Sequence, residues 1–119
     1  LRQGNTTSVY PPALASLFRL DIQPFLMNWM QYDPQEIIKE LKVPILIING
    51  TKDIQVSENE AKLLKQANPN AELVIIEKMN HVLVPIDGDT LENTKAYNEP
   101  NRELSRELIT SIKSFINSV

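Results

Sequence analysis

The chain has 119 residues, of which 42% are hydrophobic and 23% charged, and this length and composition predict one globular domain rather than two. Its net charge of -3, with 12 Lys and Arg against 15 Asp and Glu, argues against a nucleic-acid partner or a membrane-surface partner. The absence of cysteine excludes disulfides, thiolate metal sites and a cysteine nucleophile. Apolar runs such as residues 45–48 are far too short to span a bilayer, so we expect a soluble protein.

The first part of the chain is expected to be a lead-in followed by short helices. The polar stretch up to about Val9 is expected to pack loosely. Two apolar stretches, residues 13–20 and 21–30, suit short helices, and Asp21 is a plausible N-cap of the second. A capping box and a proline at the first helical position predict a third helix from Asp33 onward.

The middle of the chain predicts a parallel pair of strands. Residues 45–48 and 73–76 are apolar at every position, as expected of strands that are covered on both faces. Between them, Ser57 with Glu60 forms a capping box that starts a helix ending near Asn68. A crossover of this length is what two parallel strands require, so the pattern predicts a right-handed βαβ unit.

The last part of the chain combines an irregular segment with a helix. Residues 82–101 mix Pro, Gly, Asp, Asn and Glu without a period, which predicts a long irregular loop. Apolar residues at the helical period then predict a final helix packed on the sheet: Leu104, Leu108, Ile109, Ile112, Phe115, Ile116 and Val119. The chain is therefore expected to be an α/β protein, with a lead-in and helical segment over residues 1–32 and the α/β part over residues 33–119.

Two polar side chains follow the ends of the two predicted strands. Asp53 comes after the first strand, and His81, the one histidine of the chain, comes after the second. Because the carboxyl ends of adjacent parallel strands meet at one edge of a sheet, we expect these side chains to approach each other. An Asp in that position can hold the Nδ1–H of an imidazole while Nε2 faces a nucleophile. A turn-forming Asp and a structural His are the alternative interpretation.

The sequence predicts no cofactor and no metal. Gly50 lacks the further glycines of a nucleotide-binding loop, which disfavours a nucleotide-binding βαβ enzyme. The segment Asp87-Gly88-Asp89 lacks the further ligands of a calcium loop and is expected to be a solvated turn. Residues 25–32 are rich in aromatic residues and Met, which suits core packing or the wall of a ligand pocket.

Residues 43–56 (VPILIINGTKDIQV) followed by residues 71–81 (AELVIIEKMNH) resemble the C-terminal third of an α/β-hydrolase. The shared pattern is a strand, G-x-x-D, a helix, a second strand and then x-x-H. The resemblance covers about residues 33–119, and residues 17–34 are similar to the cap-side segment of bacterial esterase-like members. It implies that Asp53 is the acid of the catalytic triad and that His81 is its base.

The resemblance also implies what is missing. The nucleophile elbow of the family, G-x-S-x-G, is absent, because none of the three glycines of the chain flanks a serine. We therefore expect a C-terminal piece of a serine esterase or related acyl hydrolase, inactive alone, whose parent acts on a small-molecule acyl ester. Phe25, Met27 and Trp29 are the candidate apolar contacts of its substrate pocket. Leu1 is not an initiator, and the compartment, bacterial cytoplasm or export, stays open.

A non-catalytic interaction or assembly module is the alternative from another class. In the fold that the chain resembles, residues 45–48 form an interior strand, and one of its neighbours is absent from this sequence. An apolar strand with one unpaired edge recruits another chain. The sequence therefore predicts a homodimer or higher assembly.

Overall fold

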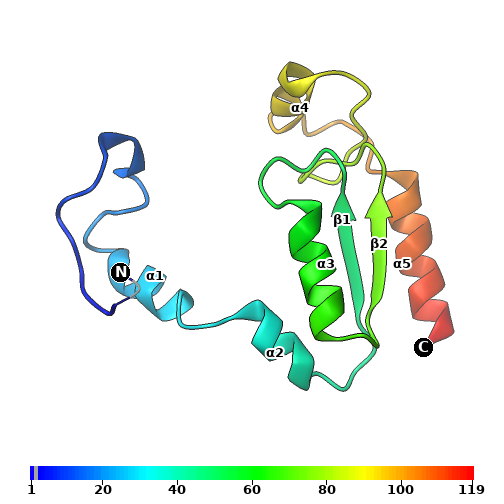
Figure 1. The fold of residues 1–119 in the computed structure, drawn as a ribbon. Coiled ribbons are helices and arrows are strands. Elements are labelled where there is room, and N and C mark those ends of the chain that lie inside the picture. Colours follow the sequence, from blue (N-terminus) through cyan, green and yellow to red (C-terminus); the bar gives the residue numbers. More distant parts are fainter. Residues whose placement is uncertain (2) are drawn as a thin grey trace. The chain divides into compact units, whose positions relative to one another are not determined.

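The computed structural model describes residue 1 and residues 3–119 (Figure 1). The chain divides into two compact units, Leu1–Ile37 and Ile38–Val119. The elements in chain order are η1 (Pro12–Leu14), α1 (Gln23–Trp29), α2 (Pro34–Glu40), β1 (Leu46–Gly50), α3 (Glu58–Ala67), β2 (Glu72–Ile76), α4 (Thr90–Ala96) and α5 (Arg106–Ser118). Among the described residues, no helix has the length and apolar character needed to cross a membrane.

The first unit is less helical than the sequence predicts. The helix expected over residues 13–20 is wrong for most of its length, since only the 3-10 turn η1 forms there and no side chain caps it. Asp21 does not cap α1 either. Its carboxylate instead accepts a hydrogen bond from Nε of Arg19 (3.1 Å), and the N-cap position of α1 is Ile22.

A buried glutamine ties the lead-in to α1. The side chain of Gln23 is fully buried, and its Oε1 accepts from the backbone N–H of Thr7 (2.8 Å). Its Nε2 donates to the carbonyl oxygens of Thr7 (2.7 Å) and Phe18 (2.6 Å). One side chain therefore satisfies three backbone groups that no helix or strand pairs.

The second unit confirms the predicted α/β class. β1 and β2 are parallel neighbours in a two-stranded sheet, and their register runs from Leu46 opposite Glu72 to Gly50 opposite Ile76. Figure 1 shows α3 on one face of this sheet and α5 on the other. The alternation of side chains along β1 fits these layers. Ile47 packs in the cluster that contains Ala61 of α3, and Ile48 packs in the cluster that contains Leu108 of α5.

The segment of residues 82–101 is not an irregular loop throughout, because it contains α4. The carboxylate of Asp89 accepts from the backbone N–H of Glu92 (3.1 Å) and caps the helix. Ala96 is buried with Val84 and Ile86 in a small core of its own. The Asp-x-x-Glu pattern was the available sequence signal for this helix. α4 lies beyond the carboxyl ends of both strands (Figure 1).

Candidate active site

Asp53 and His81 meet at the carboxyl ends of β1 and β2. Oδ2 of Asp53 lies 2.9 Å from Nδ1 of His81, a hydrogen-bonding distance. The Asp53 side chain is 8% exposed and the His81 side chain is 39% exposed. The carboxylate is therefore held inside the turn, while the imidazole reaches the surface with Nε2 left for a second partner.

The turn after β1 orients the carboxylate of Asp53. Its Oδ1 accepts from the backbone N–H groups of Gln55 and Val56, both at 2.9 Å, which leaves Oδ2 for the imidazole. Burial acts to raise the pKa of Asp53, but the hydrogen bonds from Val56, His81 and Gln55, together with the charge of His81, outweigh it. The pKa of Asp53 therefore lies below its ordinary value. An ionised carboxylate is the form that stabilises an imidazolium.

His81 lies at the tip of a short hairpin-like loop that follows β2. Met79 and Pro85 form an antiparallel bridge, and the backbone N–H of Asn80 donates to the carbonyl oxygen of Val84 (3.1 Å). Leu83 has φ of 69°, in the left-handed region that a bulky residue rarely adopts. Such strain is retained where the surrounding structure fixes it, often at functional sites.

The two loops are bonded to each other close to the pair. The backbone N–H of Lys52 donates to the carbonyl oxygen of Met79 (2.9 Å), and the backbone N–H of Lys78 donates to Oγ1 of Thr51 (2.8 Å). Gly50 makes this approach possible, because a Cβ at that position would overlap the backbone of Met79. The glycine of the G-x-x-D pattern is thus required by a close backbone approach rather than by a positive φ.

Sequence reasoning missed three buried asparagines around the pair. Asn80 and Asn93 are 1% and 2% exposed and hydrogen-bond each other. Asn49, at the end of β1, is 7% exposed, and its Oδ1 is buried without a hydrogen-bond partner among the described residues. The adjacency of Asn80 to His81 was visible in the sequence, but neither the burial of these amides nor the pairing between them was.

A hollow of about 230 Å³ lies against the pair. Its wall includes Asp53, His81, Asn49 and Leu83. The pair therefore faces space in which a hydroxyl group or a small substrate atom can reach the imidazole.

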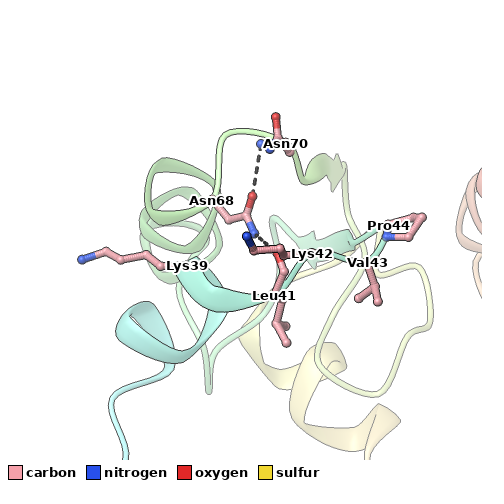
Figure 2. Close-up of a pocket in the computed structure, with 7 residues that line it drawn as sticks. All are labelled: Lys39, Leu41, Lys42, Val43, Pro44, Asn68 and Asn70. Atoms are coloured by element: carbon pink, nitrogen blue, oxygen red, sulfur yellow. Dashed lines mark hydrogen bonds between the residues drawn. The ribbon is translucent and has the colours of Figure 1, made fainter.

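A larger hollow, of about 580 Å³, lies at the opposite end of the strands, where β1 begins (Figure 2). In Figure 2 the side chain of Asn68 bonds across to neighbouring backbone, accepting from the N–H of Asn70 (3.2 Å) and donating to the carbonyl oxygen of Leu41 (3.2 Å). The hydrogen bonds of the Asn68 amide therefore connect the end of α2 to the end of α3. In parallel sheets reactive groups gather at the carboxyl ends of strands, so the hollow beside His81 is the better candidate for a site.

The residues predicted as pocket contacts all lie on α1, in the first unit. Phe25 and Trp29 are 67% and 66% exposed, and their rings lie 6.0 Å apart between centroids. Met27 is half-buried. Two large aromatic side chains exposed on one short helix are available to contact a ligand, and their role in a pocket stays a prediction.

Within the described part of the chain, no three His, Cys, Asp or Glu side chains converge as metal ligands do. The acidic turn considered as a calcium loop has other contacts. Asp87 pairs with Lys78 (2.9 Å), and Asp89 caps α4.

Comparison with known proteins gives two partial matches and no matching family model. The chain is 32% identical over 67 residues to Esterase EstD of Thermotoga maritima, an alignment that covers 54% of this chain and 16% of that protein. It is also 32% identical over 63 residues to Lipase 1 of Psychrobacter immobilis, which covers 52% of this chain and 20% of that protein. The matched part of the chain spans a fifth or less of the length of these curated relatives, and the similarity indicates a hydrolase-like origin.

Proposed function

We propose that this chain is the C-terminal part of a serine hydrolase of the α/β-hydrolase fold, an esterase or related acyl hydrolase. In this proposal Asp53 is the acid of the triad and His81 is the base. The observation that supports it most is the 2.9 Å contact between them at the carboxyl ends of two parallel strands. The partial similarity to an esterase and a lipase supports the same reaction class.

The geometry suits general base catalysis. Nε2 of His81 takes the proton of a serine hydroxyl as its oxygen attacks the acyl carbonyl carbon, and the imidazolium that forms is stabilised by the ionised Asp53. The imidazolium then gives the proton to the leaving alkoxide, and an acyl-enzyme remains. Water repeats the sequence: His81 takes one of its protons, the hydroxide adds to the acyl carbon, and the serine oxygen leaves with the returned proton.

The nucleophile and the oxyanion hole come, in this proposal, from a part of the parent protein outside the 119 residues. The chain contains no G-x-S-x-G, so no serine is offered on the sharp turn that the reaction uses. We expect the chain alone to hydrolyse esters no faster than free imidazole does. Phe25, Met27 and Trp29 are proposed as apolar contacts for the acyl group in the parent.

The test is the hydrolysis of short-chain and long-chain p-nitrophenyl esters by the parent polypeptide. Asp53→Asn and His81→Ala should each lower kcat by about 10⁴-fold, because each removes the base or its orientation. Asp87→Asn is the matched control, since Asp87 is an exposed carboxylate that pairs with Lys78 rather than with His81. Near wild-type turnover in either variant would remove that residue from the mechanism.

A second candidate is an assembly module. Within the described residues β1 pairs only with β2, so its other edge has no partner strand there. Three isoleucines on α5 are also exposed: Ile109, Ile112 and Ile116. An unpaired strand edge and exposed apolar side chains each favour self-association. Light scattering at micromolar concentration tests this, and a stable monomer would contradict it.

A further inference from the structure

α4 places a buried amide between the two loops that hold the Asp53–His81 pair. The side chain of Asn93 is 2% exposed. Its Nδ2 donates to the carbonyl oxygen of Lys52 (2.7 Å), and its Oδ1 accepts from Nδ2 of Asn80 (3.0 Å). The amide thus bonds with one end to the turn after β1 and with the other end to the loop after β2.

Both partners of this amide are direct neighbours of the pair. Lys52 precedes Asp53 in the chain, and Asn80 precedes His81. Asn80 is itself fixed, because its Oδ1 accepts from the backbone N–H groups of Val82 (3.1 Å) and Val84 (3.2 Å). The connection from Lys52 through Asn93 to Asn80 therefore joins the same two loops as the Asp53–His81 hydrogen bond.

The position requires an amide in particular. The carbonyl oxygen of Lys52 needs a donor and the buried Nδ2 of Asn80 needs an acceptor, and Asn provides both on one short side chain. A carboxylate of the same shape would set an oxygen against the carbonyl oxygen of Lys52. An apolar side chain would leave the carbonyl oxygen of Lys52 and the buried Nδ2 of Asn80 without this partner, and an unpaired buried donor is costly.

α4, which carries this amide, is fixed at both ends. Its first turn is capped by Asp89, and its far end is anchored by Ala96 in the core with Val84 and Ile86. Asn93 lies between these two anchors, so the capped helix and the packing of Ala96 on Val84, in the loop after β2, and on Ile86 together set its position.

We propose that Asn93 is a positioning residue. It holds the turn after β1, which carries Asp53, and the loop after β2, which carries His81, at the separation that lets the carboxylate orient the imidazole. Its catalytic meaning rests on the proposed function, whereas its effect on the imidazole does not. The amide acts through Lys52 and Asn80 and touches neither the imidazole nor a substrate.

The primary test measures the imidazole of His81 in this chain by nitrogen NMR at alkaline pH, where the tautomer is read from the shifts of the two ring nitrogens. In the wild type, Asp53 is expected to hold the tautomer with the proton on Nδ1. The ring-nitrogen shifts measured in Asp53→Ala give the reference for an imidazole that has lost its carboxylate partner. Asn93→Ala should move the ring shifts at least halfway toward that reference, and it should raise the pKa of Asp53 toward its ordinary value.

Two further variants make the result decisive. Asn98→Ala is the matched control, because it removes the same side chain from an exposed asparagine just after α4 and should leave the imidazole unchanged. Asn93→Asp keeps the size and the acceptor but loses the donor to Lys52, so it should shift the imidazole as Asn93→Ala does. Wild-type ring shifts in a folded Asn93 variant would overturn the proposal. Loss of the whole fold in both Asn93 variants, with Asn98→Ala folded, would overturn it as well.

A kinetic arm separates this inference from the proposed function. In the parent polypeptide Asn93→Ala should lower kcat by about 10²-fold with KM unchanged, since misplacing a reacting group by about 1 Å has an effect of that size. A parent without esterase activity, combined with the expected NMR shifts, would refute the proposed function and leave the positioning role standing. An active parent whose kcat is insensitive to Asn93→Ala would refute the catalytic meaning of the positioning role and leave the proposed function standing.

Discussion

Replacing Gly50 with alanine tests whether close packing of two backbones sets the geometry of the pair. Gly50 ends β1 and is buried against the loop that holds His81. An added Cβ would overlap the carbonyl oxygen of Met79, which is the nearest atom, and would lie 2.6 Å from the carbonyl carbon and 2.9 Å from the Cβ of the same residue. Ordinary contact begins near 3.4 Å, so relief of the contact with the carbonyl carbon alone requires the two backbones to separate by about 0.8 Å, and the carbonyl oxygen requires more.

The cost of that separation can be worked out from the bonds that it breaks. Moving the loop stretches the 2.9 Å bond from Lys52 N–H to the carbonyl oxygen of Met79 past a normal length. Overpacking costs about 1–3 kcal/mol, and one lost hydrogen bond adds about 1 kcal/mol. We therefore expect Gly50→Ala to lower the free energy of unfolding by about 2–4 kcal/mol. For the unit Ile38–Val119, that corresponds to a fall in Tm of roughly 10–30 °C.

Thermal and urea unfolding followed by circular dichroism measure this loss. Gly88→Ala is the matched control, because a Cβ there meets the flexible side chain of Glu92, which can move away, rather than backbone. Its Tm should fall by only a few degrees, since surface substitutions are usually within about 0.5 kcal/mol. Equal losses in the two variants would refute the argument that the Gly50–Met79 approach sets this geometry.

Two further predictions concern buried polar groups in the second unit. Because the pKa of Asp53 is lowered in the folded state, its stabilising effect is fully present above the unfolded value of about 3.9 and is lost as the pH falls through the folded pKa. Asp53→Asn should therefore flatten the dependence of the urea midpoint on pH in the acidic range, and an unchanged slope would contradict this. Asn68→Ala removes donor bonds to the carbonyl oxygens of Ile38 (2.8 Å) and Leu41 (3.2 Å) and should cost about 2 kcal/mol of unfolding free energy, whereas Asn70→Ala, at an exposed position, should cost little. Equal urea midpoints for the two variants would count against the role of Asn68.

The parts of the fold that local patterns encode could be predicted from the sequence. Two continuously apolar runs with a helix between them are sufficient for the parallel pair β1 and β2, although the side chain of Ser57 does not form the capping hydrogen bond expected at the start of that helix. The approach of Asp53 to His81 then follows from topology, because parallel strands bring their carboxyl ends to one edge.

The parts that depend on contacts distant in sequence could not be predicted in the same way. α4 has no hydrophobic period, and its apolar contact is made by Ala96 with Val84 and Ile86. Asparagine in a polar segment predicts a turn, so the burial of Asn80 and Asn93 was not visible. The hydrogen bond between Asn80 and Asn93 depends on where α4 packs, and no local sequence pattern predicts that packing.

The most direct measurement of the central claim is covalent labelling of the parent polypeptide with a fluorophosphonate, which reacts with a serine activated by a triad. The account predicts one labelled serine, located outside residues 1–119, with labelling lost in His81→Ala and strongly reduced in Asp53→Asn. It also predicts no labelling of the isolated chain. A labelled serine within residues 1–119, or labelling of the parent that is independent of His81, would contradict the assignment of Asp53 and His81 as a hydrolase acid and base.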